Sequence, residues 1–123
     1  MNKISLDEKF RLFDEQWSPR IVGEANGQYL KIAKVQGEFV NHSHADEDET
    51  FLCISGRFGL RFPEIGTEVI LEPGELFIVP AGVVHCPFAD EEAQIMIFEP
   101  KATAHTGKVE AEVTKAIDEQ PWV

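Results

Sequence analysis

Short apolar runs, separated by residues that favour turns, follow one another along the chain from residue 19 to residue 98. Runs of this length and spacing are typical of β-strands. The predicted strands cover residues 20–25, 28–36, 38–41, 50–55, 58–62, 68–71, 76–79, 84–88 and 93–98. So many short strands at close spacing predict an all-β sandwich or small barrel.

Two local signals refine this pattern. Asn26-Gly27 lies between the first two predicted strands and is a strong signal for a two-residue hairpin, because both positions tolerate a positive φ. Near the N-terminus, Ser5 followed three residues later by Glu8 resembles a capping box, and apolar residues recur at roughly helical spacing. A short helix is therefore expected over about residues 6–14.

The chain changes character after Pro100, where the alternation of apolar and polar residues is lost. We expect an N-terminal segment (1–18), a β-barrel (19–100) and a C-terminal tail (101–123). In that tail His105 is expected to be exposed. Either the tail is partly disordered, or Trp122 has one of two docking roles, on the barrel or on a second subunit.

Composition narrows the class of protein. The 123 residues are enough for one domain with a hydrophobic core. The chain has 22 acidic and 11 basic residues, a formal net charge of -11, which disfavours nucleic acids and anionic membranes as partners. The N-terminal residues have no apolar run of signal-peptide length, so a cytoplasmic location is expected.

The two cysteines, Cys53 and Cys86, are too few for a disulfide scaffold. Cys53 lies in the apolar run FLCIS and is interpreted as a core residue. Cys86 directly follows His85, and adjacent residues of a strand point to opposite faces. If His85 faces a pocket, Cys86 faces away from it.

The candidate chemistry lies in two segments, HSHADEDETFLCISG and GELFIVPAGVVHC. His42 and His44 are two residues apart, so on a strand both imidazoles would project from one face. Glu49 follows five residues after His44, and His85 adds a third imidazole. Three nitrogen ligands and one carboxylate suit one divalent transition metal (Fe, Mn, Ni, Zn or Cu) better than Ca²⁺ or Mg²⁺.

These segments resemble the two sequence motifs of the cupin superfamily. The first motif corresponds to Gly37, His42, His44, Glu49 and Gly56, and the second to Gly74, Pro80, Gly82 and His85. Ala89 stands where the second motif usually ends in asparagine. More narrowly, the chain is similar to small single-domain bacterial cupins of the cupin 2 type.

The resemblance implies a double-stranded β-helix, or jelly-roll barrel, with the metal ligands His42, His44, Glu49 and His85. Because cupins are commonly homodimers, the resemblance also implies a homodimer for this chain. Four protein ligands leave one or two positions open on a six-coordinate metal, and an open position is typical of a catalytic or ligand-binding site.

The surroundings of the metal are expected to be mostly apolar. In the run FGLRF, Phe58, Leu60 and Phe62 would face the barrel interior, and Arg57 and Arg61 would face outward. Near the end of the barrel either Gln94, Met96 and Phe98 or Ala93, Ile95 and Ile97 face inward. The polar residues considered as neighbours of the metal are Tyr29, Gln36 and Gln94.

Two functions remain open at this stage. The first is a metal-dependent enzyme of dioxygenase, isomerase or lyase type that acts on a small organic or sugar-like substrate. The second is a non-enzymatic module that binds or senses a metal or a small molecule. A scaffold whose histidines have lost their role is the third and weakest interpretation. In each case the expected partner is a small-molecule ligand.

Overall fold

Seven strands and one short helix make up the computed structural model, which describes residues 1–101 and 120–123. The helix is α1 (Leu6–Phe10). The strands are β1 (Arg20–Ala25), β2 (Gln28–Glu38), β3 (Glu49–Ser55), β4 (Phe58–Phe62), β5 (Thr67–Leu71), β6 (Leu76–Val79) and β7 (Cys86–Pro100). The prediction of an all-β chain with a short N-terminal helix is confirmed.

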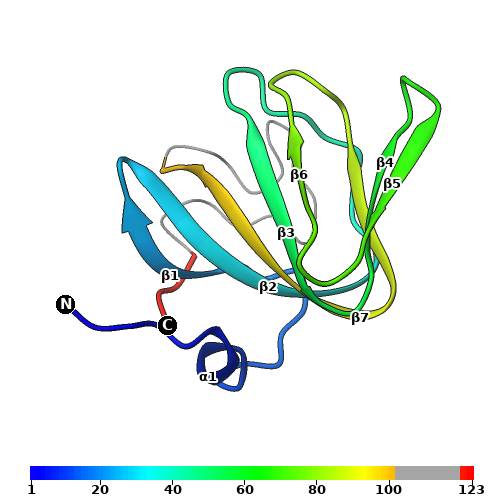
Figure 1. Ribbon diagram of the computed structural model, residues 1–123. Helices are drawn as coiled ribbons and strands as arrows, with labels where there is room; N and C mark the ends of the chain where they lie inside the picture. Colours follow the sequence, from blue (N-terminus) through cyan, green and yellow to red (C-terminus); the bar gives the residue numbers. More distant parts are fainter. Residues whose placement is uncertain (102–119) are drawn as a thin grey trace.

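The long strand β7 holds the barrel together. All strand pairs are antiparallel, and they follow the order β1-β2-β7-β3-β6, with β4 pairing both β5 and β7. The first part of β7 pairs with β4, and its later part pairs with β3. Because β7 takes part in both halves, the strands curl around one interior as a jelly-roll barrel (Figure 1).

Several predicted boundaries are wrong in detail. The predicted strands 84–88 and 93–98 are one strand, β7, in which Asp90, Glu91 and Glu92 are simply exposed. The predicted strand 38–41 does not form, because β2 ends at Glu38 and the Phe39 N–H instead donates to the carbonyl of Pro87 at 2.9 Å.

The helix is also shorter than predicted. It ends at Phe10 rather than near residue 14, because Phe13 is buried against the barrel and its carbonyl accepts a hydrogen bond from Lys34 Nζ at 2.6 Å. The Ser5 hydroxyl accepts from the Glu8 N–H as the capping box predicts. Tertiary contacts therefore end the helix before its apolar spacing does.

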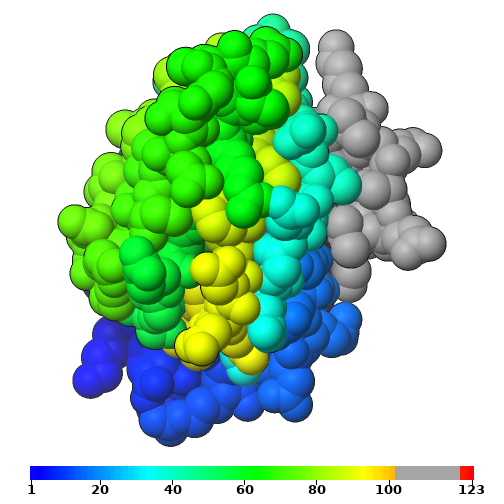
Figure 2. Space-filling view, turned by 90° about the vertical axis from the view of Figure 1, so that its right-hand side faces the viewer, coloured from blue at the N-terminus to red at the C-terminus, as the bar shows by residue number. Residues whose placement is uncertain are grey.

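Two hydrophobic clusters lie on the two faces of the curled sheet. The interior holds Ala33, Val35, Phe51, Cys53, Phe58, Leu60, Phe62, Leu71, Val79, Ala89, Ala93, Ile95 and Ile97. On the outer face, Phe10 and Phe13 of the N-terminal segment pack against the strands at Val22, Ile32 and Met96. Figure 2 shows this segment, in blue, beneath the strands. The prediction that Cys53 is a core residue is confirmed.

The last four residues return to the barrel. The Ile21 N–H donates to the carbonyl of Pro121 at 2.9 Å, and the Val123 N–H donates to the carbonyl of Ile21 at 3.0 Å. The ring of Trp122 meets Tyr29 edge-on at 5.8 Å, although 56% of the residue is exposed. Of the two predicted roles, docking on the barrel is therefore present. His105 lies outside the described residues.

No helix in the described part of the chain is both long and apolar enough to cross a membrane.

Candidate metal centre

His42 and His85 are positioned by a pair of backbone hydrogen bonds. The His42 N–H donates to the His85 carbonyl at 3.0 Å, and the His85 N–H donates to the His42 carbonyl at 2.9 Å. Each imidazole places Nδ1 at 2.9 Å from the carbonyl two residues earlier, that of Val40 or Val83. Since a carbonyl only accepts, Nδ1 carries the proton and Nε2 keeps its lone pair for a metal.

His44 and Glu49 complete the cluster from the loop before β3 and from its first residue. Glu49 Oε1 lies 3.1 Å from His85 Nε2 and 3.4 Å from His44 Nε2. The loop is tied to the opposite turn, because the Gly82 N–H donates to the His44 carbonyl at 2.8 Å and the Ala81 N–H donates to Asp48 Oδ1 at 2.9 Å. Backbone bonds thus hold the two motif segments together.

The four side chains form a cluster that fits a metal ion. They are all buried, and each offers one ligand atom such that these atoms lie within 4.8 Å of one another. His44 Nε2 is buried without a hydrogen-bond partner among the described residues. Nitrogen and carboxylate oxygen atoms that lie this close need either a proton or a cation between them, and a set of three nitrogens and one oxygen suits a divalent transition metal.

Burial and neighbouring charges set the protonation of this cluster. Burial, together with His85, lowers the pKa of His42 from 6.5 to about 4, so its imidazole is neutral at pH 7. Burial alone would raise the pKa of Glu49, but His44 and His85 outweigh it and hold that pKa well below its ordinary value. A neutral imidazole and an ionised carboxylate are the forms that bind metals.

A second charged pair lies beside this cluster. Lys31 Nζ donates to Glu99 Oε1 at 2.6 Å, and the side chains are 0% and 3% exposed. Burial and the nearby charge of Glu49 raise the pKa of Glu99 well above its ordinary range, although Lys31 opposes them. Lys31 and Glu99 are thus two ionisable residues in an interior whose surroundings the sequence predicted to be mostly apolar.

A small cavity of about 30 Å³ adjoins the cluster. His42, Glu49 and Glu99 contribute to its wall, and most of the remaining wall is apolar. Trp17 covers the cavity together with Phe39, on which it stacks at 4.8 Å, and Trp17 Nε1 donates to the carbonyl of Gln36 at 2.8 Å. Trp17 has a φ of +56°, an uncommon conformation for a bulky residue that this docking maintains.

The alternation predicted for β4 is confirmed. Phe58, Leu60 and Phe62 are buried inside, whereas Arg61 lies on the outside and forms ion pairs with Glu38 and Glu68. Cys86 lines a separate surface groove beside Arg61 and is not in the metal cluster. It therefore faces away from the site, as predicted.

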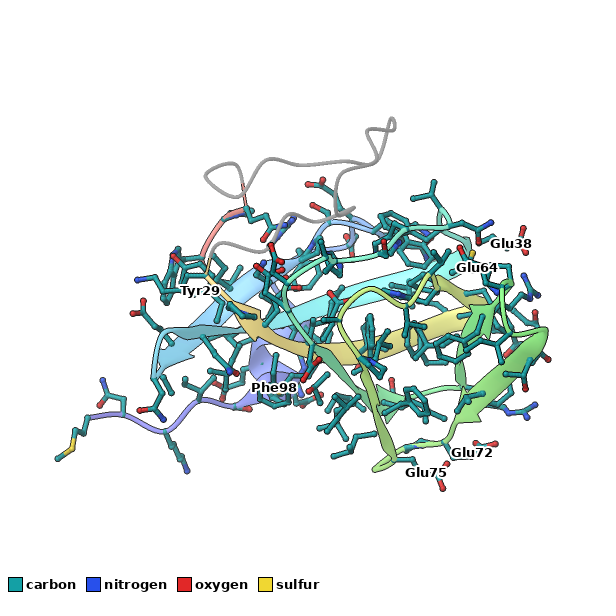
Figure 3. All side chains as sticks on the ribbon, turned by 90° about the horizontal axis from the view of Figure 1, so that it is seen from above. Tyr29, Glu38, Glu64, Glu72, Glu75 and Phe98 are labelled. Atoms are coloured by element: carbon teal, nitrogen blue, oxygen red, sulfur yellow. The ribbon has the colours of Figure 1, made fainter. Side chains whose placement is uncertain are left out.

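The polar residues considered as neighbours of the metal lie elsewhere. Gln36 is exposed and bonds to Gln16, and Tyr29 packs against Trp122 at the end of β2 opposite Glu38 (Figure 3). On β7 it is the set Ala93, Ile95 and Ile97 that faces inward, so Gln94 is not in the cavity wall.

The free energy of unfolding, measured as the pH falls below 6.5, tests the environment of His42. Its lowered pKa means that the unfolded chain binds one proton more than the folded chain between pH 6.5 and about 4. Stability from this residue is therefore present above pH 6.5 and is lost as the pH falls, by about 3 kcal/mol in total. We expect urea unfolding of chelator-treated protein to show a steeper loss of stability over this range in wild type than in His42→Gln. Equal slopes would contradict the assignment.

Comparison with known proteins places this site in a family. A family model described as Cupin domain matches residues 29–101. The chain belongs to the cupin domain family. The match covers all four members of the cluster, together with Lys31 and Glu99, and leaves out Trp17.

Individual proteins are similar to this chain in sequence or in fold. A cupin-2 domain protein of Shewanella frigidimarina is 44% identical, with a TM-score of 0.76 over 79% of this chain and 93% of that chain. YdbB of Bacillus subtilis is 31% identical over 64 residues, which are 52% of this chain and 56% of YdbB, so the alignment spans about half of that relative. Hydroquinone 1,2-dioxygenase of a Sphingomonas species is 18% identical, with a TM-score of 0.70 over 80% of this chain and 32% of that chain, and shares the fold alone.

Proposed function

We propose that this cupin is a metal-dependent enzyme in which His42, His44, Glu49 and His85 hold one divalent transition metal and a small oxygen-containing substrate occupies the remaining coordination positions. The observation that carries the proposal is the convergence of four buried ligand atoms within 4.8 Å beside a cavity. When bound, the metal would supply Lewis-acid or redox chemistry at the substrate oxygen.

The residues of the chain have three tasks in this function. The hydrogen bonds from Nδ1 of His42 and His85 to backbone carbonyls fix the direction of each Nε2 lone pair. Glu49 supplies one negative charge, so a divalent ion keeps a formal charge of about +1 and attracts anionic oxygen ligands. The apolar wall contributed by residues such as Phe51, Ile95 and Ile97 excludes water and strengthens these electrostatic interactions.

A second candidate function rests on the size of the cavity. Its volume of about 30 Å³ holds one or two water-sized groups, so larger substrates enter only if the side chains of Trp17 and Phe39 move. A site closed in this way also suits a module that binds a metal or a small ligand without turnover.

Turnover assays decide between the two functions. Metal-loaded protein would be assayed against panels of sugars, β-diketones, keto acids and phenols, with His44→Ala as the inactive control. The proposal predicts metal-dependent turnover of at least one class that is absent from the variant. Tight binding of a panel member without any turnover would favour the binding module instead.

A further inference from the structure

The buried Lys31–Glu99 pair is the feature of the interior that the metal cluster does not explain. Lysine is almost never fully buried unless it is paired, and burying two charges commonly costs more than their attraction returns. Both residues belong to the inward-facing positions of their strands, Lys31 with Ala33 and Val35 on β2, and Glu99 with Ile97 on β7. Well-packed apolar side chains often replace such a buried ion pair with little loss of stability, so the pair is a candidate for a role in function.

One oxygen of this pair is left without a partner. Glu99 Oε1 accepts from Lys31 Nζ at 2.6 Å, whereas Glu99 Oε2 is buried and has no hydrogen-bond donor among the described residues. The neighbouring Glu49 is ionised and can only accept, so this oxygen of Glu99 has no partner when Glu99 is ionised and can donate only to Glu49 when Glu99 is protonated. A buried polar atom without a partner is costly, and a bound ligand would satisfy it.

The position of Glu99 indicates which ligand that is. Glu99 shares the cavity wall with His42 and Glu49, two members of the metal cluster. A molecule in this cavity therefore meets the metal with one polar group and Glu99 with another. The cavity of about 30 Å³ takes two polar groups only if they lie close together, and the rest of even a small molecule enters only if the side chains of Trp17 and Phe39 move.

The formal charge of the site further narrows the chemical class of the ligand. The metal and Glu49 leave a formal charge of about +1, which one carboxylate balances, and Lys31 adds a further positive charge where Glu99 is protonated. The site therefore favours an anionic ligand in both protonation states of Glu99. A hydroxyl both donates and accepts hydrogen bonds, so it pairs with Glu99 Oε2 in either protonation state of that carboxyl group.

We propose that Glu99, held in place by Lys31, is the specificity-determining residue of the site and selects small α-hydroxy acids, whose carboxylate binds the metal while the adjacent hydroxyl bonds to Glu99. This inference rests on the proposed metal-dependent function.

A matched pair of ligands tests this assignment. The full-length protein would be loaded with Co²⁺ and titrated with glycolate and with acetate, which differ by the hydroxyl alone, while the visible absorption of Co²⁺ is followed. The decisive variant is Lys31→Met/Glu99→Leu, which removes the polar group without leaving an unpaired buried charge. Its control is Glu24→Leu/Lys101→Met, which removes an exposed Lys–Glu pair whose side chains are 42% and 47% exposed.

Wild type is expected to prefer glycolate over acetate, and the decisive variant should lower the ratio of the two dissociation constants by about tenfold, the effect of one lost hydrogen bond. The part of the preference that comes from chelation stays in the variant, and the control keeps the wild-type ratio. Glu99→Gln, which conserves the side-chain volume, should lower the ratio less and serves if the double variant does not fold.

The outcomes separate this inference from the function on which it rests. If both ligands alter the Co²⁺ spectrum but the ratio is the same in wild type and in a Glu99 variant, Glu99 does not determine specificity and only this inference is overturned. If Co²⁺ binds and neither ligand alters its spectrum, the metal has no open position, and both proposals are overturned.

Discussion

Glu49→Gln is expected to lower the affinity of the protein for Co²⁺ or Zn²⁺ by more than about 100-fold, since changes to residues that merely support metal ligands already cost 10–100-fold. Glu49 is the only one of the four proposed ligands that carries a negative charge, and its side chain is buried among the three imidazoles. The amide of glutamine conserves its volume but removes that charge. Competition with a chelating dye measures the affinity.

The matched control for this experiment is Asp46→Asn. Asp46 lies three residues earlier on the same loop, is exposed and does not belong to the cluster. The Asp46→Asn variant loses the same unit of charge from the same segment. Its affinity for the metal should stay within about twofold of wild type, because exposed charges are largely screened. Equal affinities of Glu49→Gln and Asp46→Asn would show that Glu49 is not a ligand.

The second large effect concerns stability. Lys31→Met is expected to lower the free energy of unfolding by about 3–5 kcal/mol, because it leaves Glu99 buried without its partner. Urea unfolding of the metal-free protein measures the change. Lys31→Met/Glu99→Leu should recover most of this loss, since it removes both charges together.

Lys101→Met is the control for the stability experiment. Lys101 also pairs with a glutamate, Glu24, at 3.1 Å, but both side chains are exposed to solvent. An exposed pair contributes at most about 1 kcal/mol, so this variant should unfold close to wild type. If Lys31→Met were as stable as Lys101→Met, the interior pair would not be buried as described.

The residues of the candidate site were largely predictable from the sequence. The prediction used two histidines that are two residues apart, a glutamate five residues later and a third histidine in the second segment. The structure brings all four side chains together, those of His42, His44, Glu49 and His85. Backbone hydrogen bonds between His42 and His85 join the two segments. The spacing of the ligand residues within each segment then decides which side chains point toward the cluster.

What the sequence did not yield is the charged pair beside the metal. The last predicted strand stopped at residue 98, one residue before Glu99. Strand β7 continues to Pro100, and carrying the inward alternation of Ile95 and Ile97 two residues further would have placed Glu99 inside. Lys31 gave no such signal, because only tertiary pairing distinguishes a buried lysine from an exposed one.

The packing of Trp17 and Phe39 over the cavity could not be predicted from the sequence either. Trp17 precedes the first strand and adopts a φ of +56°, which nothing in its local sequence requires. Its position depends on Phe39 and on the carbonyl of Gln36, about 20 residues away along the chain. Long-range contacts of this kind decide how the site is closed.

The central claim is that His42, His44, Glu49 and His85 together hold one divalent transition metal. An anomalous difference map from crystals grown with Co²⁺ tests it most directly. The account predicts one strong peak per chain, about 2.0–2.2 Å from a nitrogen of each of the three histidines and from an oxygen of Glu49. A folded protein with no peak at this cluster, or with its only peak elsewhere, would contradict it.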